Sequence, residues 1–273
     1  MTERAVDIPL ASHREKVIIP RLYEVPWQPL LLEGGVRGPA IKMLSRGTGG
    51  AFHPDPAYPV ATWISHLPPG WGDFELVYHP CVEESFVLGG TGWMGDRIRD
   101  PGYYLYRPPG ILHGPAFNPP YSERTLLQRF GAGTDTLLRY EGDEFPLVDC
   151  QAVTDEHESW PVTWVEQLDS NSLPWVATED GPWRGTSHKW LSRNRVTGGG
   201  TLLIQIPAGW SGDGSAARGG IEELVVHGEL SMGGQWFERW GYACRPAGDP
   251  ADGYQALGGA CLICFWDQNE FEG

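Results

Sequence analysis

Two short segments carry side chains of the kinds that bind divalent metal ions. The first holds His79 and Glu83, four residues apart, and the second places His113 three residues after the turn sequence RPPG. Pro80 disfavours a helical pairing of His79 with Glu83, so we expect a turn or bulge that brings both side chains to one interior face. The prolines and glycine of RPPG could aim His113 at the same point. Such groups near turns are also commonly solvated or locally hydrogen-bonded, so residue types alone leave a structural role open.

An internal repeat indicates the elements that must position these side chains. Several unusual strings recur in the two halves of the 273-residue chain, in the same order and at nearly the same separations. The matched pairs are VPWQPLLLEGGVRGPAIKMLSR with LPWVATEDGPWRGTSHKWLSR, TWISHLPPGW with TLLIQIPAGW, EESFVLGG with EELVVHGE, and GYYLYRPPG with GYACRPAG. Four ordered matches are hard to obtain by chance, so we expect an old duplication.

Short apolar segments interrupted by turn residues predict strands in each half. The chain has 37 Gly and 24 Pro, and these break most of its apolar runs. Each half reads as strand, PxGW turn, strand, glycine turn, strand, RPxG turn and strand, which predicts a small closed barrel. The acidic stretch VTDEHES predicts a boundary between residues 1–152, which include an N-terminal arm, and residues 153–273.

The two segments with candidate ligands resemble the two motifs of the cupin superfamily. HPCVEESFVLGG is similar to the first motif, and GYYLYRPPGILH is similar to the second. The resemblance covers residues 62–130 closely and residues 201–266 as a degenerate copy. It implies an all-β fold of two tandem cupin barrels, also described as double-stranded β-helices or jelly rolls.

The resemblance also implies a metal site in the first barrel. Carried over residue by residue, it gives His79, Glu83 and His113 as ligands, whereas Val77 takes the place of a further histidine that the first motif usually offers. Three protein ligands leave about three positions of an octahedral ion open, which suits Fe(II) that must bind substrate and O2 together. We expect one divalent metal ion per chain, with Fe(II) as the first choice and Zn²⁺, Mn²⁺ or Ni²⁺ as alternatives.

The second barrel is predicted to have lost this site. An ungapped alignment of the halves replaces Val77, His79, Glu83 and His113 by Ala216, Arg218, Glu222 and Ala251. A single carboxylate beside an arginine is a candidate for a salt bridge and not for a transition-metal site. We therefore expect the C-terminal barrel to be structural.

Strand alternation predicts which side chains share the barrel interior with the metal. The candidate pocket residues are Val77, Ser85, Val87, Tyr104, Tyr106 and Gln128. Alternation from the ligands supports the first three, whereas the tyrosines and the glutamine could equally face away. His66 is the candidate catalytic base or substrate contact, although a surface or core position is the commoner role of a histidine. A largely apolar wall would admit a small hydrophobic or aromatic molecule.

Charge and composition exclude several classes of protein. The chain has 35 acidic and 20 basic side chains, and its net charge of −15 opposes nonspecific binding to nucleic acid or to an anionic membrane. It contains no apolar run near the ~20 residues of a membrane helix and no signal-peptide pattern, so we expect a cytoplasmic protein. The five cysteines lack a zinc-knuckle spacing, and Cys261 and Cys264 lie in an apolar run that predicts a buried strand. A homodimer is compatible with the expected fold.

Three classes of function stay open at this point. A non-heme Fe(II) dioxygenase that acts on a small oxygenated, aromatic or dicarbonyl substrate follows from the resemblance and the open coordination positions. A lyase or isomerase could use the metal as a Lewis acid, with a base such as His66 or a tyrosine. A small-molecule-binding module without catalysis comes last, because the first barrel carries usable ligands.

Overall fold

The computed structural model describes residues 15–31, 37–48, 59–79, 82–130, 148–149, 161–213, 217, 219–250 and 253–269. These residues form strands, turns and two short 3-10 helices, so the predicted all-β fold is confirmed. No helix in this part of the chain is long and apolar enough to cross a membrane.

Residues of the first half form a large and a small antiparallel sheet. In spatial order the seven-stranded sheet contains β14 (Val165–Asp169), β9 (Tyr103–Arg107), β6 (Glu83–Gly90), β12 (Arg124–Phe130), β4 (Pro59–Leu67), β3 (Arg37–Thr48) and β2 (Gln28–Leu31). The four-stranded sheet contains β5 (Gly72–Asp73), β11 (Ala116–Phe117), β7 (Gly92–Met94) and β8 (Arg97–Arg99). A short parallel pair joins β10 (Ile111–Leu112) to β13 (Val148–Asp149).

The second half repeats both sheets with the same strand order. Its seven-stranded sheet contains β1 (Val17–Ile19), β22 (Tyr242–Arg245), β19 (Ile221–Gly228), β24 (Ala260–Gln268), β17 (Gly198–Ile206), β16 (Ser187–Arg193) and β15 (Val176–Ala177). Its four-stranded sheet contains β18 (Trp210–Gly212), β23 (Tyr254–Ala256), β20 (Leu230–Met232) and β21 (Gln235–Phe237). The topology therefore has the repeat that the sequence indicates.

Side-chain contacts repeat along with the strands. Lys42 lies 4.8 Å from the ring centre of Trp27, and Lys189 lies 4.3 Å from the ring centre of Trp175. Each lysine also donates, at 2.9 Å, to the first carbonyl of the preceding 3-10 helix, which is η1 (Leu22–Glu24) or η3 (Ser170–Ser172). These lysines are buried, and the two contacts satisfy their ammonium groups in the same way in both halves.

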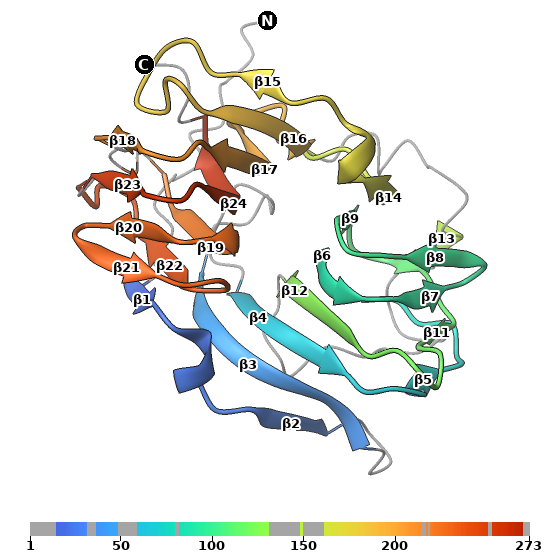
Figure 1. Ribbon diagram of the computed structural model, residues 1–273. Helices are drawn as coiled ribbons and strands as arrows, with labels where there is room; N and C mark the ends of the chain where they lie inside the picture. Colours follow the sequence, from blue (N-terminus) through green and yellow to red (C-terminus); the bar gives the residue numbers. More distant parts are fainter. Residues whose placement is uncertain are drawn as a thin grey trace, which may run out of the picture.

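Each large sheet includes one strand from the other half of the chain. β1 pairs with β22 in the second-half sheet, and β14 pairs with β9 in the first-half sheet. Figure 1 shows β1, in blue, beside the orange strands, and β14, in yellow, beside the green β9. The division at residues 152 and 153 stays a prediction, but the sheet pairing ties the chain together on both sides of it.

The two large sheets pack against each other and share one hydrophobic core. Its buried members come from both halves and include Leu44, Ile64, Phe86, Leu127, Leu191, Leu203, Leu224, Ile263 and Phe265. β24 contributes Cys261 and Cys264 to buried surroundings as unpaired thiols, in line with the prediction of a buried strand. Cys81 and Cys150 lie outside the described residues.

Buried charges cross this interface. The Nε atom of Arg129 lies 3.1 Å from Glu222 Oε1, and its NH1 atom lies 3.7 Å from Glu84 Oε2. Arg129 therefore links the corresponding carboxylates of β6 and β19, and its guanidinium packs over Phe265 at 5.1 Å. A buried cation shared by two buried carboxylates ties the two sheets in one register.

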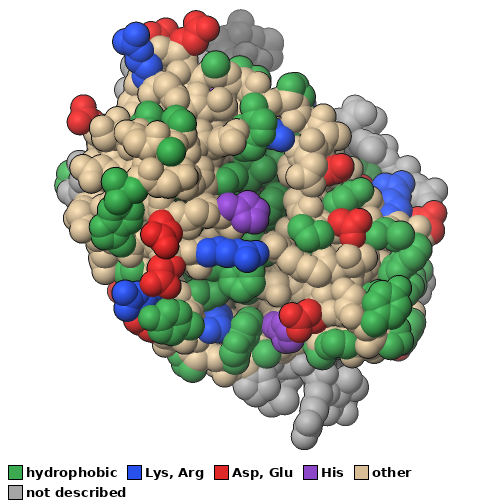
Figure 2. All heavy atoms as spheres, viewed as in Figure 1, with side chains coloured by type: hydrophobic (Ala, Val, Ile, Leu, Met, Phe, Trp, Pro, Cys, Tyr) green, Lys and Arg blue, Asp and Glu red, His purple; other side chains and the backbone are tan. Residues whose placement is uncertain are grey.

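On the outer surface, charges of both signs are interspersed. Figure 2 shows the basic side chains of one face as separate spots among acidic and hydrophobic ones, and not as a continuous patch within the described residues.

Tyr104 should contribute measurably to the cohesion of the two halves. Tyr104 donates its hydroxyl hydrogen bond to Glu84 at 2.5 Å and lies 2.7 Å from Ser192 Oγ across the interface. Tyr104→Phe leaves these buried groups without that partner, so the free energy of unfolding should fall by about 1 to 3 kcal/mol. Chemical denaturation checks this, with the exposed Tyr121→Phe as the matched control. Equal stability of the two variants would contradict the assignment.

Candidate metal centre

The fold brings the three predicted ligands together. The ligand atoms of His79, Glu83 and His113 all lie within 4.8 Å of one another, and all three side chains are buried. Val77 and His113 exchange two backbone hydrogen bonds of 2.9 and 2.8 Å, and Gly110 donates to the carbonyl of His79 at 2.8 Å. Gly110 has a φ of 83°, which a residue with a side chain rarely adopts, so the RPPG turn requires glycine there. The turn therefore aims His113 at the start of β6.

A backbone carbonyl fixes His113 in a form that can bind a metal. Its Nδ1 atom lies 2.9 Å from the carbonyl oxygen of Ile111, which can only accept a hydrogen bond. Nδ1 therefore carries the proton, and the lone pair of Nε2 points to the cluster, 3.6 Å from Glu83 Oε2. Burial lowers the pKa of His113 well below its ordinary value, and the nearby cation Arg107 lowers it further. The neutral imidazole is the form that metal binding requires.

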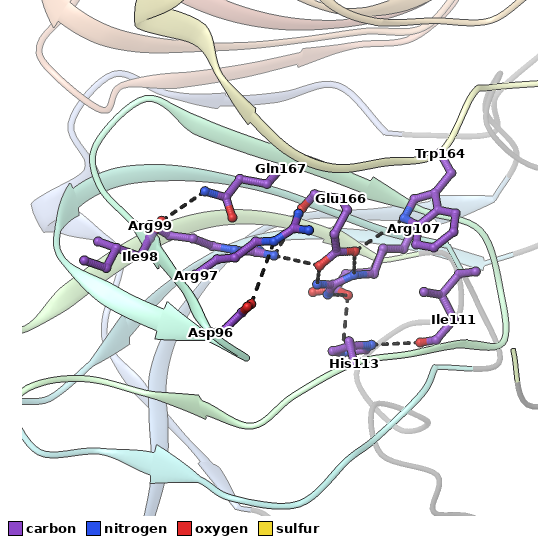
Figure 3. A network of polar contacts seen from close by, with 11 residues as sticks. Asp96, Arg97, Ile98, Arg99, Arg107, Ile111, His113, Trp164, Glu166 and Gln167 are labelled. Atoms are coloured by element: carbon purple, nitrogen blue, oxygen red, sulfur yellow. Dashed lines mark hydrogen bonds and ion pairs between the residues drawn. The ribbon is translucent and has the colours of Figure 1, made fainter. Parts of the chain in front are cut away.

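Glu83 is held as a carboxylate by an ion chain, of which Arg107, Glu166 and Arg99 are labelled in Figure 3. Arg107 NH1 donates to Glu83 Oε2 at 2.7 Å, and Arg107 Nε and NH2 donate to Glu166 at 2.9 and 2.6 Å. Arg99 NH2 donates to the same Glu166 at 3.0 Å. Burial alone would raise the pKa of Glu83, but Arg107, His113 and His79 outweigh it and hold the pKa below its ordinary value.

These donors fit a first-row divalent metal ion. Ligand atoms that each lie about 2 Å from one ion are about 3 to 4 Å from one another, and the 3.6 Å between His113 Nε2 and Glu83 Oε2 falls in that range. His79 packs its ring against His113 at 5.0 Å and meets the edge of Phe130 at 5.0 Å, which restricts its rotation. Two neutral imidazoles and one carboxylate would hold such an ion and leave its other positions to the cavity.

A cavity between the large and the small sheet adjoins the three ligands. It offers about 140 Å³ to the centres of water molecules. Of the predicted pocket residues, five line it: Val77, Ser85, Val87, Tyr104 and Gln128. Gln128, on the cavity wall, accepts a hydrogen bond from Ser65. Most of the exposed cavity wall is apolar, as expected from the sequence.

The structure corrects the placement of Tyr106 and limits that of Tyr104. On β9 the side chain of Arg107 faces the ligands, so Tyr106, one residue earlier, faces the core between the halves and does not line the cavity. Tyr104 has the same parity, and its hydroxyl group is bound to Glu84 and Ser192 at the interface. Neither phenol group is available to act on a molecule in the cavity.

His66 also lies away from the site. Trp63 and Leu67 on β4 line the cavity. His66 lies an odd number of residues from both, so its side chain faces the other side of the strand and does not line the cavity. Its Nε2 atom lies 3.8 Å from Glu123, and its ring packs against Trp27 at 5.8 Å. The candidate role of catalytic base is therefore corrected to a partly exposed surface position.

The ligand loss in the second half is more complete than the ungapped alignment predicts. Glu83 pairs with Arg107 across β6 and β9, and the residue opposite Arg245 in the second half is Ile221. The hydrogen bond from Gly110 to His79 has its counterpart between Gly248 and Ala217, so the position of His79 is taken by Ala217. The alignment is wrong by one residue because the segment after Trp210 is one residue shorter. Ala216, Arg218 and Ala251 themselves lie outside the described residues.

Sequence reasoning missed the arginines of the site and their partner. Arg107 and Arg245 recur in the two RPxG turns, which is a signal that could have marked a structural cation. Glu166 lies far away in the sequence, on the exchanged strand β14, and no motif points to it. Arg99 and Arg124 line the cavity and are also outside the motifs.

Comparisons with known proteins show the fold and leave the reaction open. No protein-family model and no curated protein matches the sequence. The structure resembles a presumed dioxygenase from Nostoc punctiforme, with a TM-score of 0.74, 17% identity and coverage of 97% of this chain and 90% of that one. It also resembles salicylate 1,2-dioxygenase from Pseudoaminobacter salicylatoxidans with gentisate (0.51, 15%, 76% and 68%) and an oxalate decarboxylase (0.52, 13%, 95% and 78%). At these identities the likeness shows a shared fold alone, and that fold agrees with the all-β architecture predicted from the sequence.

Removing either imidazole should empty the site. Purified protein should carry about one divalent ion per chain, and His79→Ala or His113→Ala should retain less than about a tenth of it, because two remaining ligands bind such ions weakly. Elemental analysis after desalting measures this, with His66→Ala as the matched histidine control. Full metal content in both ligand variants would rule out the centre.

The ion chain behind Glu83 should tune metal affinity. Glu166→Gln removes the charge that orients Arg107, so the affinity for Zn²⁺ should fall about 10- to 100-fold although no ligand is lost. Competition with a chromophoric chelator measures the affinity, and the exposed Glu179→Gln serves as control. An unchanged affinity in Glu166→Gln would show that Arg107 needs no support.

Proposed function

We propose that this protein is a non-heme Fe(II) dioxygenase that acts on a small oxygenated substrate, of the aromatic or dicarbonyl class. The observation that carries the proposal is the buried cluster of His79, Glu83 and His113 at the wall of a largely apolar cavity. Three protein ligands leave room for both a substrate oxygen and O2, which fits this class.

A bound Fe(II) would supply the electrons that activate O2, whereas the protein supplies orientation and a dry site. The carbonyl of Ile111 holds His113 in one tautomer, and Arg107 holds the Glu83 carboxylate in one position. Apolar residues such as Val87, Leu105 and Leu126 line the cavity and exclude water from the reacting groups.

The overall reaction balances without a further reductant. A dioxygenase of this kind breaks one C–C bond of the substrate and places both atoms of O2 in the product, so substrate and O2 are the only reactants. Two of the structural neighbours are named as dioxygenases, so the proposed reaction class is one for which this fold is used. One of them was solved with gentisate, a small aromatic molecule. We therefore include small phenols and β-diketones among the candidate substrates.

Oxygen uptake tests the proposed reaction class. Protein reconstituted with Fe(II) under anaerobic conditions should consume O2 in an electrode when a substrate from a panel of small phenols and β-diketones is added. His113→Ala should lower the rate at least about 100-fold, because the ion is lost, whereas His66→Ala should keep it. Substrate turnover without O2, by the Zn²⁺ or Mn²⁺ form, would instead establish the Lewis-acid lyase or isomerase as the function.

A further inference from the structure

The wall of the metal cavity contains a buried cation that the metal centre does not use. Arg124, at the start of β12, lines the cavity and is only 2% exposed. Among the described residues no ion pair or side-chain hydrogen bond of Arg124 is recorded, and its buried Nε atom has no partner. Burial lowers the pKa of Arg124 to about 10, which still leaves it charged at neutral pH. A charged guanidinium removed from water without a counter-ion is unfavourable unless something else fills that role.

The neighbouring strands hold this guanidinium in place. A Cβ atom on Gly92 of β7 would lie 2.6 Å from Arg124 Cζ and 2.6 Å from Asn118 Oδ1, so only glycine leaves room for the arginine there. Gly92 pairs with Arg99 across β7 and β8, and Arg99 also lines the cavity. The field of Arg124 is one of the causes that lower the pKa of Arg99 to about 9, after burial, the largest cause. The two arginines therefore form one positive region of the wall.

A charge count shows that one positive charge is unmatched. Arg107 and Arg99 face the two carboxylates Glu83 and Glu166 in the ion chain of Figure 3, so these four groups balance. Arg124 has no recorded carboxylate partner in the part of the chain that the structure describes. A divalent metal ion at Glu83 would add to the positive charge of the cavity and would not reduce it.

Acidic residues at the cavity mouth do not pair with Arg124. Asp73 and Glu75 line the cavity, but Glu75 is exposed and Asp73 is partly exposed, so water reaches both. Neither has a recorded ion pair with Arg124 within the described part of the chain. Within the described residues, therefore, no side chain supplies the counter-ion of Arg124, and a molecule that enters the cavity would supply it.

We propose that Arg124, with Arg99 beside it, binds a carboxylate group of the substrate, while the metal centre holds another part of the same molecule. This inference rests on the proposed function for the second contact, but the carboxylate contact can be tested alone. A planar carboxylate matches the two parallel N–H groups of a guanidinium, and one unmatched charge fits a monoanion better than a phosphate ester, which carries about −1.5 to −2. The apolar residues between the arginines and the metal centre, among them Val87, Leu105 and Leu126, fit a hydrocarbon or aromatic body.

Binding to metal-free protein separates this contact from the metal. The full chain, stripped with a chelator, is titrated with 3-phenylpropanoate and with 3-phenylpropanamide, which has the same shape without the charge. Trp63 and Trp71 line the cavity, so their fluorescence reports occupancy, and calorimetry gives the affinities. Wild-type protein should bind the acid at least about tenfold more tightly than the amide, as expected for hydrogen bonds to a charged group.

The variants assign that preference to Arg124. Arg124→Gln should lower the affinity for the acid at least about tenfold, to that for the amide, and leave amide binding unchanged. Arg97→Gln, which removes a half-exposed arginine of β8, should change neither affinity. The melting temperature of metal-free Arg124→Gln should equal or exceed that of wild type, because a buried unpaired charge is removed. A purely structural arginine would give a lower melting temperature and the same acid preference.

Two results would overturn the proposal. The first is equal binding of acid and amide by wild-type protein, and the second is an undiminished acid preference in Arg124→Gln. Should that variant fail to fold, the melting temperature of wild-type protein decides, since the acid must raise it and the amide must not. The assay needs neither iron nor O2, so a protein that consumes no O2 can still show the acid preference, and an active dioxygenase can still lack it.

Discussion

A buried carboxylate needs a permanent cation, and Arg107 provides that cation for Glu83. The two groups lie 2.7 Å apart, and each side chain is almost fully buried. Arg107 in turn needs a second carboxylate to satisfy its remaining N–H groups, and Glu166 provides it from β14, the strand that the second half contributes to the first-half sheet. The position of a metal ligand in one half therefore depends on a residue of the other half. Exchange of the first strands is thus part of the site and not only of the fold.

The second half shows how the same scaffold is arranged where Ala217 and Ile221 replace His79 and Glu83. Arg245 occupies the position of Arg107, but Ile221 stands where Glu83 would be, and the cation pairs with Glu223 at 3.3 Å instead. Tyr254 donates its hydroxyl group to Glu223 at 2.8 Å, which completes a closed set of buried polar groups. Aromatic rings, among them Trp183, stacked on Trp210 at 5.8 Å, fill the interior around it. The arginine is thus common to both copies, whereas the metal ligands distinguish the first.

The sequence predicted the parts of this protein that local patterns determine. The repeat, the all-β fold and the meeting of His79, Glu83 and His113 follow from motifs whose turns fix the chain direction. Alternate residues of a strand face the same side, so counting every second residue from His79 and Glu83 correctly placed Val77, Ser85 and Val87 on the cavity wall.

The remaining features depend on contacts that no local pattern records. β6 is buried on both faces over its first six residues, so it carries no polar and apolar alternation that would reveal which face meets the cavity. For the same reason Tyr104 and Tyr106 could not be oriented from the sequence, because their face is covered by the other large sheet. Arg107 and Arg129 each have a partner from the other half of the chain, Glu166 and Glu222, and spacing in the sequence cannot place these partners.

Burial on both faces has a further consequence for the chemistry of the cavity. Because β6 and β9 are fixed from behind by the second half, their inward side chains cannot move aside for a bound molecule as they could on a free sheet. With the proposed metal ion and the proposed anion contact, the fixed groups would select for an oxygen donor to the ion held by Glu83, apolar contacts along Val87 and Leu126, and an anion at Arg124. A molecule that lacks one of these features leaves a buried polar group unpaired, which discriminates more strongly than a missing apolar contact. In this proposal the second half would contribute to selectivity through rigidity, although Ala217 and Ile221 stand at its positions of His79 and Glu83.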